Sequence, residues 1–235
     1  MSALEIGCAR ALELREERVG ANDANAWRLC YASDLHFTAR RAHLALRLRE
    51  VIERAAPDAI LLGGDLLDRA NGAGALARCV AELGALAPVF AVAGNHDGWV
   101  GAHAAREAVR TSGGHWLHDG AVVLRSHERR ALQLVASTDV ARVERALRVF
   151  VGHDPAVFPR AAASGCSLVL AGHLHGGQCT LWERGGRQYP GAFLSRWNGL
   201  RFEQPGSTLL VSRGVADTLP IRFRCPREVL LCRMS

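Results

Sequence analysis

Short apolar runs alternate with amphipathic segments through the first hundred residues of the chain. Residues 27–33, 59–63 and 89–93 are apolar runs with the length of buried strands. Between them, residues 39–56 and 75–86 carry apolar side chains at helical spacing. This order predicts a β-α-β-α-β unit, in which helices join parallel strands.

The same alternation continues before strands come to dominate the pattern. We expect helices near residues 102–111 and 140–147, and a further helix between the last two strands of the next group. The predicted strands are 121–125, 132–136, 149–152 and 168–171, followed by 178–182, 208–212 and 229–232. No linker or repeat divides the chain, so we expect one α/β domain over residues 1–235, with sheets covered by helices.

Composition supports a globular chain and excludes several kinds of chemistry. The chain has 235 residues, 49% of them hydrophobic, and a net charge of +6. All 29 basic residues are arginines, which excludes Schiff-base catalysis and a phosphate-binding P-loop, because both need a lysine amine. Arginine instead offers a planar fork that binds phosphate at two points.

Cysteine usage and the amino-terminal segment bear on the compartment. The cysteines are odd in number and not spaced as CxxC, which favours reduced and mostly buried thiols: Cys8, Cys30, Cys79, Cys166, Cys179, Cys225 and Cys232. Residues 1–20 mix charges without a signal-peptide run, and other apolar runs are far shorter than a membrane span. We therefore expect a cytoplasmic protein, and a peripheral contact with the inner membrane surface stays open.

Polar residues cluster directly after the predicted strands. They are Asp34 and His36, residues 64–68 (GDLLD), residues 94–97 (GNHD), His153, and residues 172–175 (GHLH). Ligands of open α/β sheets bind beyond the carboxyl ends of the strands, so these five segments are expected to converge.

The residue types in these segments are those of a metal site. Asp-x-His and His-x-His place two ligands at alternate positions, which point the same way if the segment is extended. Carboxylate, imidazole and amide ligands without cysteine favour two divalent cations over a structural zinc. Asp34 and Asp65 bring two negative charges against four positive, which favours an anionic substrate such as a phosphoryl group.

These five ordered blocks resemble the pattern of the calcineurin-like metallophosphoesterase superfamily. The resemblance implies a four-layer α/β/β/α sandwich with two central sheets flanked by helices. It also implies two divalent ions, with Mn favoured over Fe, Zn, Co or Mg, and a bridging hydroxide that attacks phosphorus in line. One ion would be held by Asp34, His36 and His175, and the other by Asn95, His153 and His173, with Asp65 as the bridge.

The resemblance assigns roles to three further residues. His96 would stabilise the transition state or protonate the leaving oxygen, and Asp97 would orient it. Asp68 would not bind an ion itself but would support the residues that do. Residues 172–178, 211–214 and 220–228 are similar to the bacterial YkuE/YaeI-like phosphodiesterases and to the metallophosphoesterase form of UDP-2,3-diacylglucosamine pyrophosphatase, although Leu174 replaces their usual threonine. That branch implies cleavage of phosphodiester or pyrophosphate bonds, in a nucleotide-sugar or lipid-linked substrate.

Three side chains are candidates for substrate contact. Arg69 follows Asp68 and either binds phosphate or is solvated, and Trp99 either forms an apolar lip or packs. For Arg213 we favour a phosphate contact over a role in capping the sheet. The glycine-, arginine- and aromatic-rich segment 185–204 is either a rim that grips an amphiphilic or nucleotide substrate or an ordinary loop.

Three other functions remain as alternatives. A Ser/Thr protein phosphatase resembles the segment around Arg69, but there Ala70 replaces glycine and Asp97 replaces glutamate. A nuclease would use the net positive charge, yet the arginines are interleaved with glutamates and no stacking aromatic accompanies them, so we expect no specific nucleic-acid binding. A scaffold without catalysis is disfavoured because every candidate ligand is present.

Overall fold

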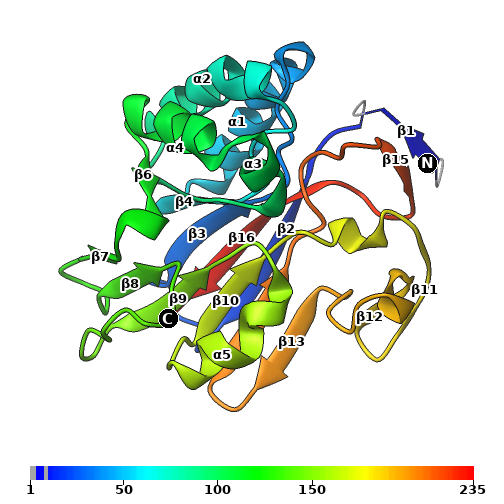
Figure 1. Ribbon diagram of the computed structural model, residues 1–235. Coiled ribbons are helices and arrows are strands. Elements are labelled where there is room, and N and C mark those ends of the chain that lie inside the picture. The colour runs from blue at the N-terminus through cyan, green and yellow to red at the C-terminus, as the bar shows by residue number, and fades with distance from the viewer. Residues whose placement is uncertain (1–3, 8–9) are drawn as a thin grey trace.

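The computed structural model describes residues 4–7 and 10–235, which form two six-stranded sheets packed face to face (Figure 1). The first sheet has the order β2 (Glu13–Val19), β16 (Glu228–Met234), β3 (Trp27–Ala32), β4 (Ala59–Gly63), β5 (Val89–Val92) and β6 (His115–Trp116). The second has the order β13 (Arg201–Gln204), β14 (Ser207–Val211), β10 (Leu168–Ala171), β9 (Leu147–Val151), β8 (Leu132–Val135) and β7 (Val122–Leu124). In each sheet four neighbouring strands, β3–β4–β5–β6 and β14–β10–β9–β8, run parallel.

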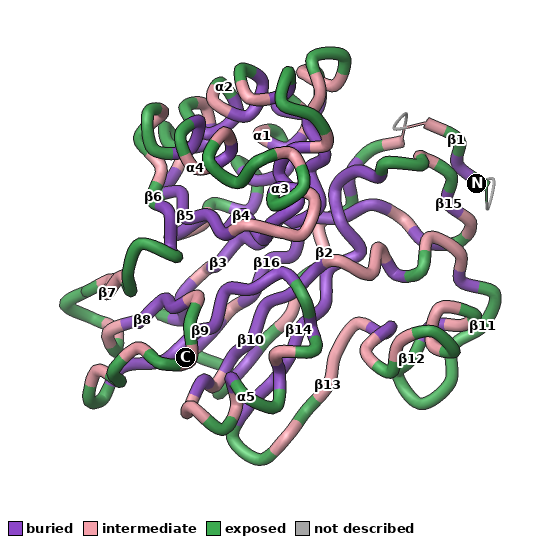
Figure 2. The backbone as a smooth tube through the Cα atoms, viewed as in Figure 1, coloured by how far each residue is buried: buried purple, intermediate pink, exposed green. Residues whose placement is uncertain are grey.

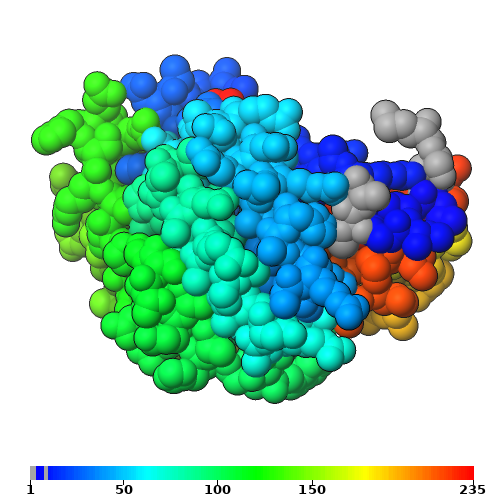
Figure 3. Space-filling model, turned by 90° about the horizontal axis from the view of Figure 1, so that it is seen from above, coloured from blue at the N-terminus to red at the C-terminus, as the bar shows by residue number. Residues whose placement is uncertain are grey.

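Helices complete the outer layers. The outer face of the first sheet is covered by α1 (His43–Ala55), α2 (Ala73–Gly84) and α4 (Ala102–Thr111), as the view from above shows (Figure 3). The outer face of the second sheet packs against α5 (Phe158–Ala163), and the short α3 (Asn95–Val100) follows β5. Short 3-10 turns span Ala39–Arg41, Ala70–Gly72, Leu117–Asp119, Pro155–Val157, His175–Gly177 and Gly191–Phe193.

The apolar run of β4 shows why these strands read as continuously hydrophobic. Ile60 and Leu62 pack under the helices, while Ala59 and Leu61 pack between the two sheets. Both faces of the strand are therefore buried, as in sheets covered on both sides. The predicted α/β sandwich of two sheets flanked by helices is confirmed.

Two small antiparallel pairs lie beside the sandwich. The strand β1 (Leu4–Ile6) pairs with β15 (Ile221–Phe223), and β11 (Thr180–Arg184) forms a hairpin with β12 (Arg187–Pro190). Both pairs lie on the same side of the molecule (Figure 1, right). Among the residues described, no helix is both long and apolar enough to cross a bilayer.

The predicted helix at residues 140–147 is wrong. That segment is a loop leading into β9, and buried side chains of the sheet bind its backbone. Gln133 Nε2 donates to the carbonyl of Ala141 at 2.8 Å, and Gln133 Oε1 accepts from the amide of Val143 at 3.2 Å. Arg148 donates to the carbonyl of Val140 at 2.7 Å. These bonds satisfy the loop backbone in place of helical hydrogen bonds.

Two other parts of the sequence-based assignment need correction. The amphipathic segment 39–56 is divided into a 3-10 turn and α1. The charged strand β2 was not predicted, because five of its seven residues are Glu or Arg and its sequence, ELREERV, does not alternate apolar and polar residues. It lies at the edge of the first sheet, parallel to β16, where charged side chains reach solvent.

Cysteine thiols are distributed as the composition suggested. Six free cysteines lie within the described residues, and five of them are buried: Cys30, Cys79, Cys166, Cys225 and Cys232. Burial raises the pKa of Cys30 to about 12, so this thiol stays protonated and unreactive. Cys8 lies outside the described residues.

Candidate metal centre

The carboxyl ends of β3, β4, β5, β9 and β10 carry the predicted site residues, and these residues gather at one edge of the sandwich. They surround an open cavity of about 290 Å³ lined by His36, Asp65, Asn95, His96, His173, His175, Gln178, Asp217, Thr218 and Leu219. The expected convergence of the strand ends is therefore observed.

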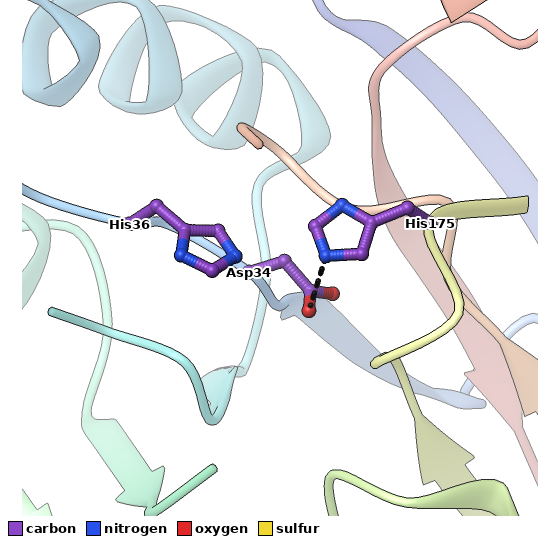
Figure 4. A group of neighbouring side chains, drawn as sticks. All are labelled: Asp34, His36 and His175. Atoms are coloured by element: carbon purple, nitrogen blue, oxygen red, sulfur yellow. Dashed lines mark ion pairs between the residues drawn. The ribbon is translucent and has the colours of Figure 1, made fainter. Parts of the chain in front are cut away.

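Asp34, His36 and His175 form a first cluster of candidate ligands. One nitrogen or oxygen atom of each lies within 4.8 Å of the others. The carboxylate of Asp34 points toward the imidazole of His175, with Oδ1 3.3 Å from Nε2 (Figure 4). The second oxygen of Asp34 accepts a hydrogen bond from Ser33 Oγ at 2.6 Å, which fixes the carboxylate in place.

Asp65, His153 and His173 form a second cluster with the same spacing limit. Asp65 Oδ2 lies 3.2 Å from His153 Nε2, and Asn95 Oδ1 lies 3.0 Å from the same nitrogen. His153 Nδ1 is 2.8 Å from the carbonyl of Gly63, which can only accept a hydrogen bond. Nδ1 therefore carries a proton. Nε2 faces the carboxylate of Asp65, and although burial alone would lower the pKa of His153, this contact raises it to about 9. A cation held by His153 would replace the proton on Nε2.

Asp65 connects the two clusters. Its Oδ2 is 3.2 Å from His153 Nε2 and 3.9 Å from His36 Nε2. Burial by itself would raise the pKa of Asp65, but hydrogen bonds from His153 and from the His96 amide hold it at about 2. The carboxylate is thus ionised and placed between the two sets of nitrogens.

The donor set fits two divalent cations. His36 Nε2 is buried, and within the described part of the chain it has no hydrogen-bond partner. A buried nitrogen without a partner is costly unless a ligand uses it. Burial also lowers the pKa of His36 to about 4, which keeps the neutral imidazole that binds metal. The orphaned nitrogen and the shared carboxylate are what a pair of bridged cations requires.

The backbone of the ligand-bearing segments is unusual. Five predicted ligands lie in the left-handed region: Asp34 (φ 58°), His36 (44°), Asp65 (50°), His173 (71°) and His175 (50°). Such a conformation costs on the order of 1–3 kcal/mol for a residue other than glycine and is concentrated at functional sites.

This backbone corrects the expectation that Asp-x-His and His-x-His are extended. Asp34 and His36 do converge on one cluster, whereas His173 and His175 separate into different clusters. The candidate ligands are packed closely, and glycines that lie against them in space make room for their side chains. A Cβ at Gly94 would lie 2.1 Å from Asp65 Oδ1.

Asp97 has a different role from the one predicted. Its buried carboxylate accepts backbone amides of Leu66, Leu67 and Gly94 at 3.1, 2.9 and 2.8 Å. Burial raises the pKa of Asp97 above its usual value, although the three amide hydrogen bonds oppose that change. Asp97 lies in the first turn of α3, where unpaired amides are available, and it ties the loop after β4 to the loop after β5. The prediction that it orients the imidazole of His96 is wrong.

Asp68 lies where Asp97 was expected. Its Oδ1 is 3.6 Å from His96 Nδ1 and 3.4 Å from His36 Nδ1. Thr218 Oγ1 donates to the same oxygen at 2.8 Å. Asp68 therefore supports a cavity-lining histidine and a candidate ligand together.

Asp217 is a site residue that the sequence reasoning missed. It is buried, and its Oδ1 lies 2.7 Å from His175 Nδ1. Arg222 donates to both of its oxygens, at 2.7 and 2.8 Å, and Arg227 donates at 2.9 Å. Arg227 in turn pairs with Glu5 of β1. A carboxylate behind a ligating histidine fixes its tautomer and orientation, and no motif in the sequence marks this one.

The predicted substrate contacts separate into two groups. The ring of Trp99 is 4.6 Å from that of His96, and its side chain is largely exposed. Arg69 is also exposed, immediately after Asp68. Trp99 therefore lies beside a residue that lines the cavity, and Arg69 follows the carboxylate that contacts His36 and His96.

Arg213 is engaged elsewhere. Its Nε donates to Glu228 Oε2 at 2.7 Å, and its NH2 group lies 3.2 Å from Glu13. These carboxylates compete with any phosphate for the guanidinium, so the favoured substrate contact is not retained. The backbone carbonyl of Arg213 accepts a hydrogen bond from Arg222 at 2.7 Å, which gives the residue a structural place behind Asp217.

Taken together, the fold and the two clusters define a protein built to hold two cations beside an open cavity. Residues 28–177 match the calcineurin-like phosphoesterase family, and the chain belongs to that family. It is therefore a metal-dependent phosphoesterase, as the ordered motifs indicated. The family implies a dimetal site, and the two Asp/His clusters agree with it.

Relatives and solved structures are consistent with this membership. The phosphodiesterase YaeI of Escherichia coli is 30% identical over 231 residues, covering 91% of this chain and 84% of YaeI. An uncharacterised metallophosphoesterase of Aquifex aeolicus is 27% identical, covering 85% of this chain and 82% of its own. The crystal structure of a dimetal phosphatase from Danio rerio shares the fold, with a TM-score of 0.55 and 13% identity, covering 89% of this chain and 99% of that one.

Proposed function

We propose that this phosphoesterase hydrolyses phosphodiester or pyrophosphate bonds. The observation that carries the proposal is Asp65, which lines the open cavity and lies beside nitrogens of both ligand clusters. The similarity to a protein named as a phosphodiesterase supports the diester over the monoester. The similarity of residues 172–178, 211–214 and 220–228 to the YkuE/YaeI-like branch supports the same choice.

The ligand clusters define which residues would hold the cations. Asp34, His36 and His175 would hold one, and Asn95, His153 and His173 the other, with Asp65 between them. Two bound ions, manganese first among the candidates, would polarise the phosphoryl oxygens and lower the pKa of a water placed for in-line attack. Iron, zinc, cobalt and magnesium are compatible with the same donors.

His96 is the residue we assign to the leaving group. It lines the cavity and is partly exposed, so its imidazole can donate a proton to the departing oxygen. Asp68, which is itself held by a hydrogen bond from Thr218, lies beside Nδ1 of that imidazole and would orient it. Trp99, next to His96, would form an apolar lip for the leaving group, and Arg69 would pair with a further phosphate.

The substrate class follows from the rim of the cavity. Trp99 and Leu219 are large, exposed apolar side chains at or beside the rim, which suits a phosphate that carries bulky groups on both sides. Nucleotide-sugar and lipid-linked phosphoesters have this character. Buried, unpaired thiols support action in a reducing cytoplasm.

Hydrolysis of model esters tests the proposal. Protein stripped with chelator and reloaded with Mn²⁺ should cleave bis(p-nitrophenyl) phosphate faster than p-nitrophenyl phosphate. His96→Ala and Asp65→Ala should abolish this activity, while Asp139→Asn, an exposed change far from the motifs, should retain it. A strong preference for the monoester would favour the protein-phosphatase alternative, and tight Mn²⁺ binding without turnover of either ester would favour a scaffold.

A further inference from the structure

An exposed aromatic surface lies on the hairpin β11–β12 and the turn that follows it. We call residues 180–196 the aromatic lobe. Leu181 and Trp182 are 49% and 46% exposed, and Phe193 and Leu194 are 73% and 93% exposed. The lobe stands out from the sandwich as mostly exposed chain (Figure 2, right). Large apolar side chains grouped in this way mark an interaction surface rather than ordinary surface variation.

The aromatic rings of the lobe hold one another in place. Trp182 and Tyr189 stack with centroids 5.3 Å apart and planes within 3°. Phe193 meets Tyr189 edge-on at 5.0 Å and Trp182 at 6.2 Å. The rings therefore hold one another as a group at the surface.

The lobe is also positively charged. Arg184, Arg187 and Arg196 are exposed, and Glu183 is the acidic residue of the segment. Glu183 accepts a hydrogen bond from Gln188 at 3.1 Å. Exposed Trp, Phe and Leu side chains flanked by arginines match the lipid–water interface, where rings enter the headgroup layer and guanidinium groups pair with phosphates.

The apolar surface reaches the rim of the metal cavity. Gln178 lines that cavity and donates to the carbonyls of Leu219 at 2.6 Å and Ile221 at 3.3 Å. Leu219 also lines the cavity and is 63% exposed, and Ile221 is 45% exposed. A single backbone β-bridge pairs Cys179 with Phe223, and it keeps the segment before β11 alongside β15 (Figure 1). A surface bound by the lobe would thus lie next to the cavity.

We propose that the aromatic lobe docks on the surface of an anionic lipid bilayer. Docking would bury Trp182, Phe193 and Leu194 in the headgroup layer and bring Arg184 and Arg187 onto lipid phosphates. The cavity beside Leu219 would then face headgroups rather than bulk water. This surface goes beyond the proposed reaction, and its substrate consequence, a phosphoester presented at a membrane, rests on that reaction.

Vesicle sedimentation tests the docking without any turnover. The wild-type protein should bind phosphatidylglycerol-containing vesicles and bind pure phosphatidylcholine vesicles at least about tenfold more weakly, since the charge attraction is lost. The double variant Phe193→Ser/Leu194→Ser should lose binding about tenfold or more. Arg184→Ser/Arg187→Ser should lose it in part, and added salt should weaken the wild type. The control Leu46→Ser, which changes an exposed apolar residue on α1, should bind like the wild type.

Three results would overturn the docking. They are wild-type protein that ignores anionic vesicles, a Phe193→Ser/Leu194→Ser variant that binds as well as the wild type, and a wild-type dimer that this variant converts to a monomer in light scattering. The last result would assign the lobe to a second copy of the chain. Hydrolysis of soluble bis(p-nitrophenyl) phosphate, measured on the same samples, reports separately on the proposed reaction and should persist in the variant.

Discussion

The loops after β3, β4 and β10 differ from the loop 136–146, between β8 and β9, in what holds their backbone. In the first group Asp34, Asp65 and His173 adopt positive φ, and ligand atoms of both clusters lie around the cavity. In loop 136–146, Gln133 and Arg148 reach out from the sheet and bind loop carbonyls and an amide.

The difference shows two origins of irregular backbone. Loop 136–146 is satisfied by the chain itself, so its irregularity is a matter of internal hydrogen bonding. The ligand loops hold strained residues and a buried nitrogen, His36 Nε2, without a partner in the described chain. Strain and an unmet polar atom together indicate a site that is completed by something bound.

Removing the shared carboxylate should break this contrast most strongly. Asp65→Ala deletes a carboxylate that lies beside both clusters, so we expect Mn²⁺-dependent diester hydrolysis to fall by more than about 100-fold. Substitution of a residue that only supports a ligand typically costs about 10–100-fold. Metal analysis after dialysis should find fewer bound ions per chain. Retention of two ions with full turnover would contradict the bridging role.

Neutralising the carboxylate behind His175 should have the next largest effect. Asp217→Asn keeps the shape but weakens the contact that orients His175, so metal affinity should drop by about 10–100-fold. Competition with a chelator measures this directly, independently of turnover. If Asp217 were only structural, melting temperature would fall while metal affinity matched that of the wild type.

Two glycine substitutions compare a crowded turn at the site, that of Gly94, with an open turn away from it, that of Gly206. Gly94→Ala would place a methyl group against the carboxylate of Asp65, and we expect about 1–3 kcal/mol of destabilisation together with reduced activity. Gly206 has φ +75° and open space around it, so Gly206→Ala should cost roughly 1 kcal/mol of strain and leave activity unchanged. Denaturant melts and ester hydrolysis on both variants check this. Equal loss of activity in the two would argue against crowding at Asp65.

A change in the side chain of β8 that holds loop 136–146 should affect stability alone. Gln133→Leu leaves the carbonyl of Ala141 and the amide of Val143 without their partner, at a cost of about 1–3 kcal/mol. Diester hydrolysis and metal content should match the wild type at temperatures where the variant is folded. Altered metal content would show that the two loop regions are coupled.

Sequence reasoning predicted most of the site because the ligands follow strands whose carboxyl ends meet. The apolar runs of β3, β4, β5, β9 and β10 mark those strands, and the motifs mark their ends. The left-handed backbone of the ligands was not predictable in the same way. It arises from tertiary crowding, as between Gly94 and Asp65, and local propensity opposes it.

The misassigned residues share a physical cause. Asp217 and Thr218 come from the loop after β14. Asp217 reaches His175 from the loop after the neighbouring strand β10, and Thr218 reaches Asp68 from the other sheet, so no spacing along the chain reveals either contact. Asp97 sits next to His96 in sequence, yet the free amides at the start of α3 capture its carboxylate. Residues 140–147 have helical spacing, but the buried Gln133 competes for their backbone.

The position of β16 has a consequence for the order in which the chain folds. This strand inserts between β2 and β3, and its Glu228 pairs with Arg15 from 213 residues away. Pairing of such distant segments is slow, because loop closure precedes any gain in contacts. Asp217 precedes this strand in the chain, with β15 between them, so we expect the orientation of His175 to accompany the closing of the first sheet. Refolding followed by metal uptake should therefore lag behind the gain of helical signal.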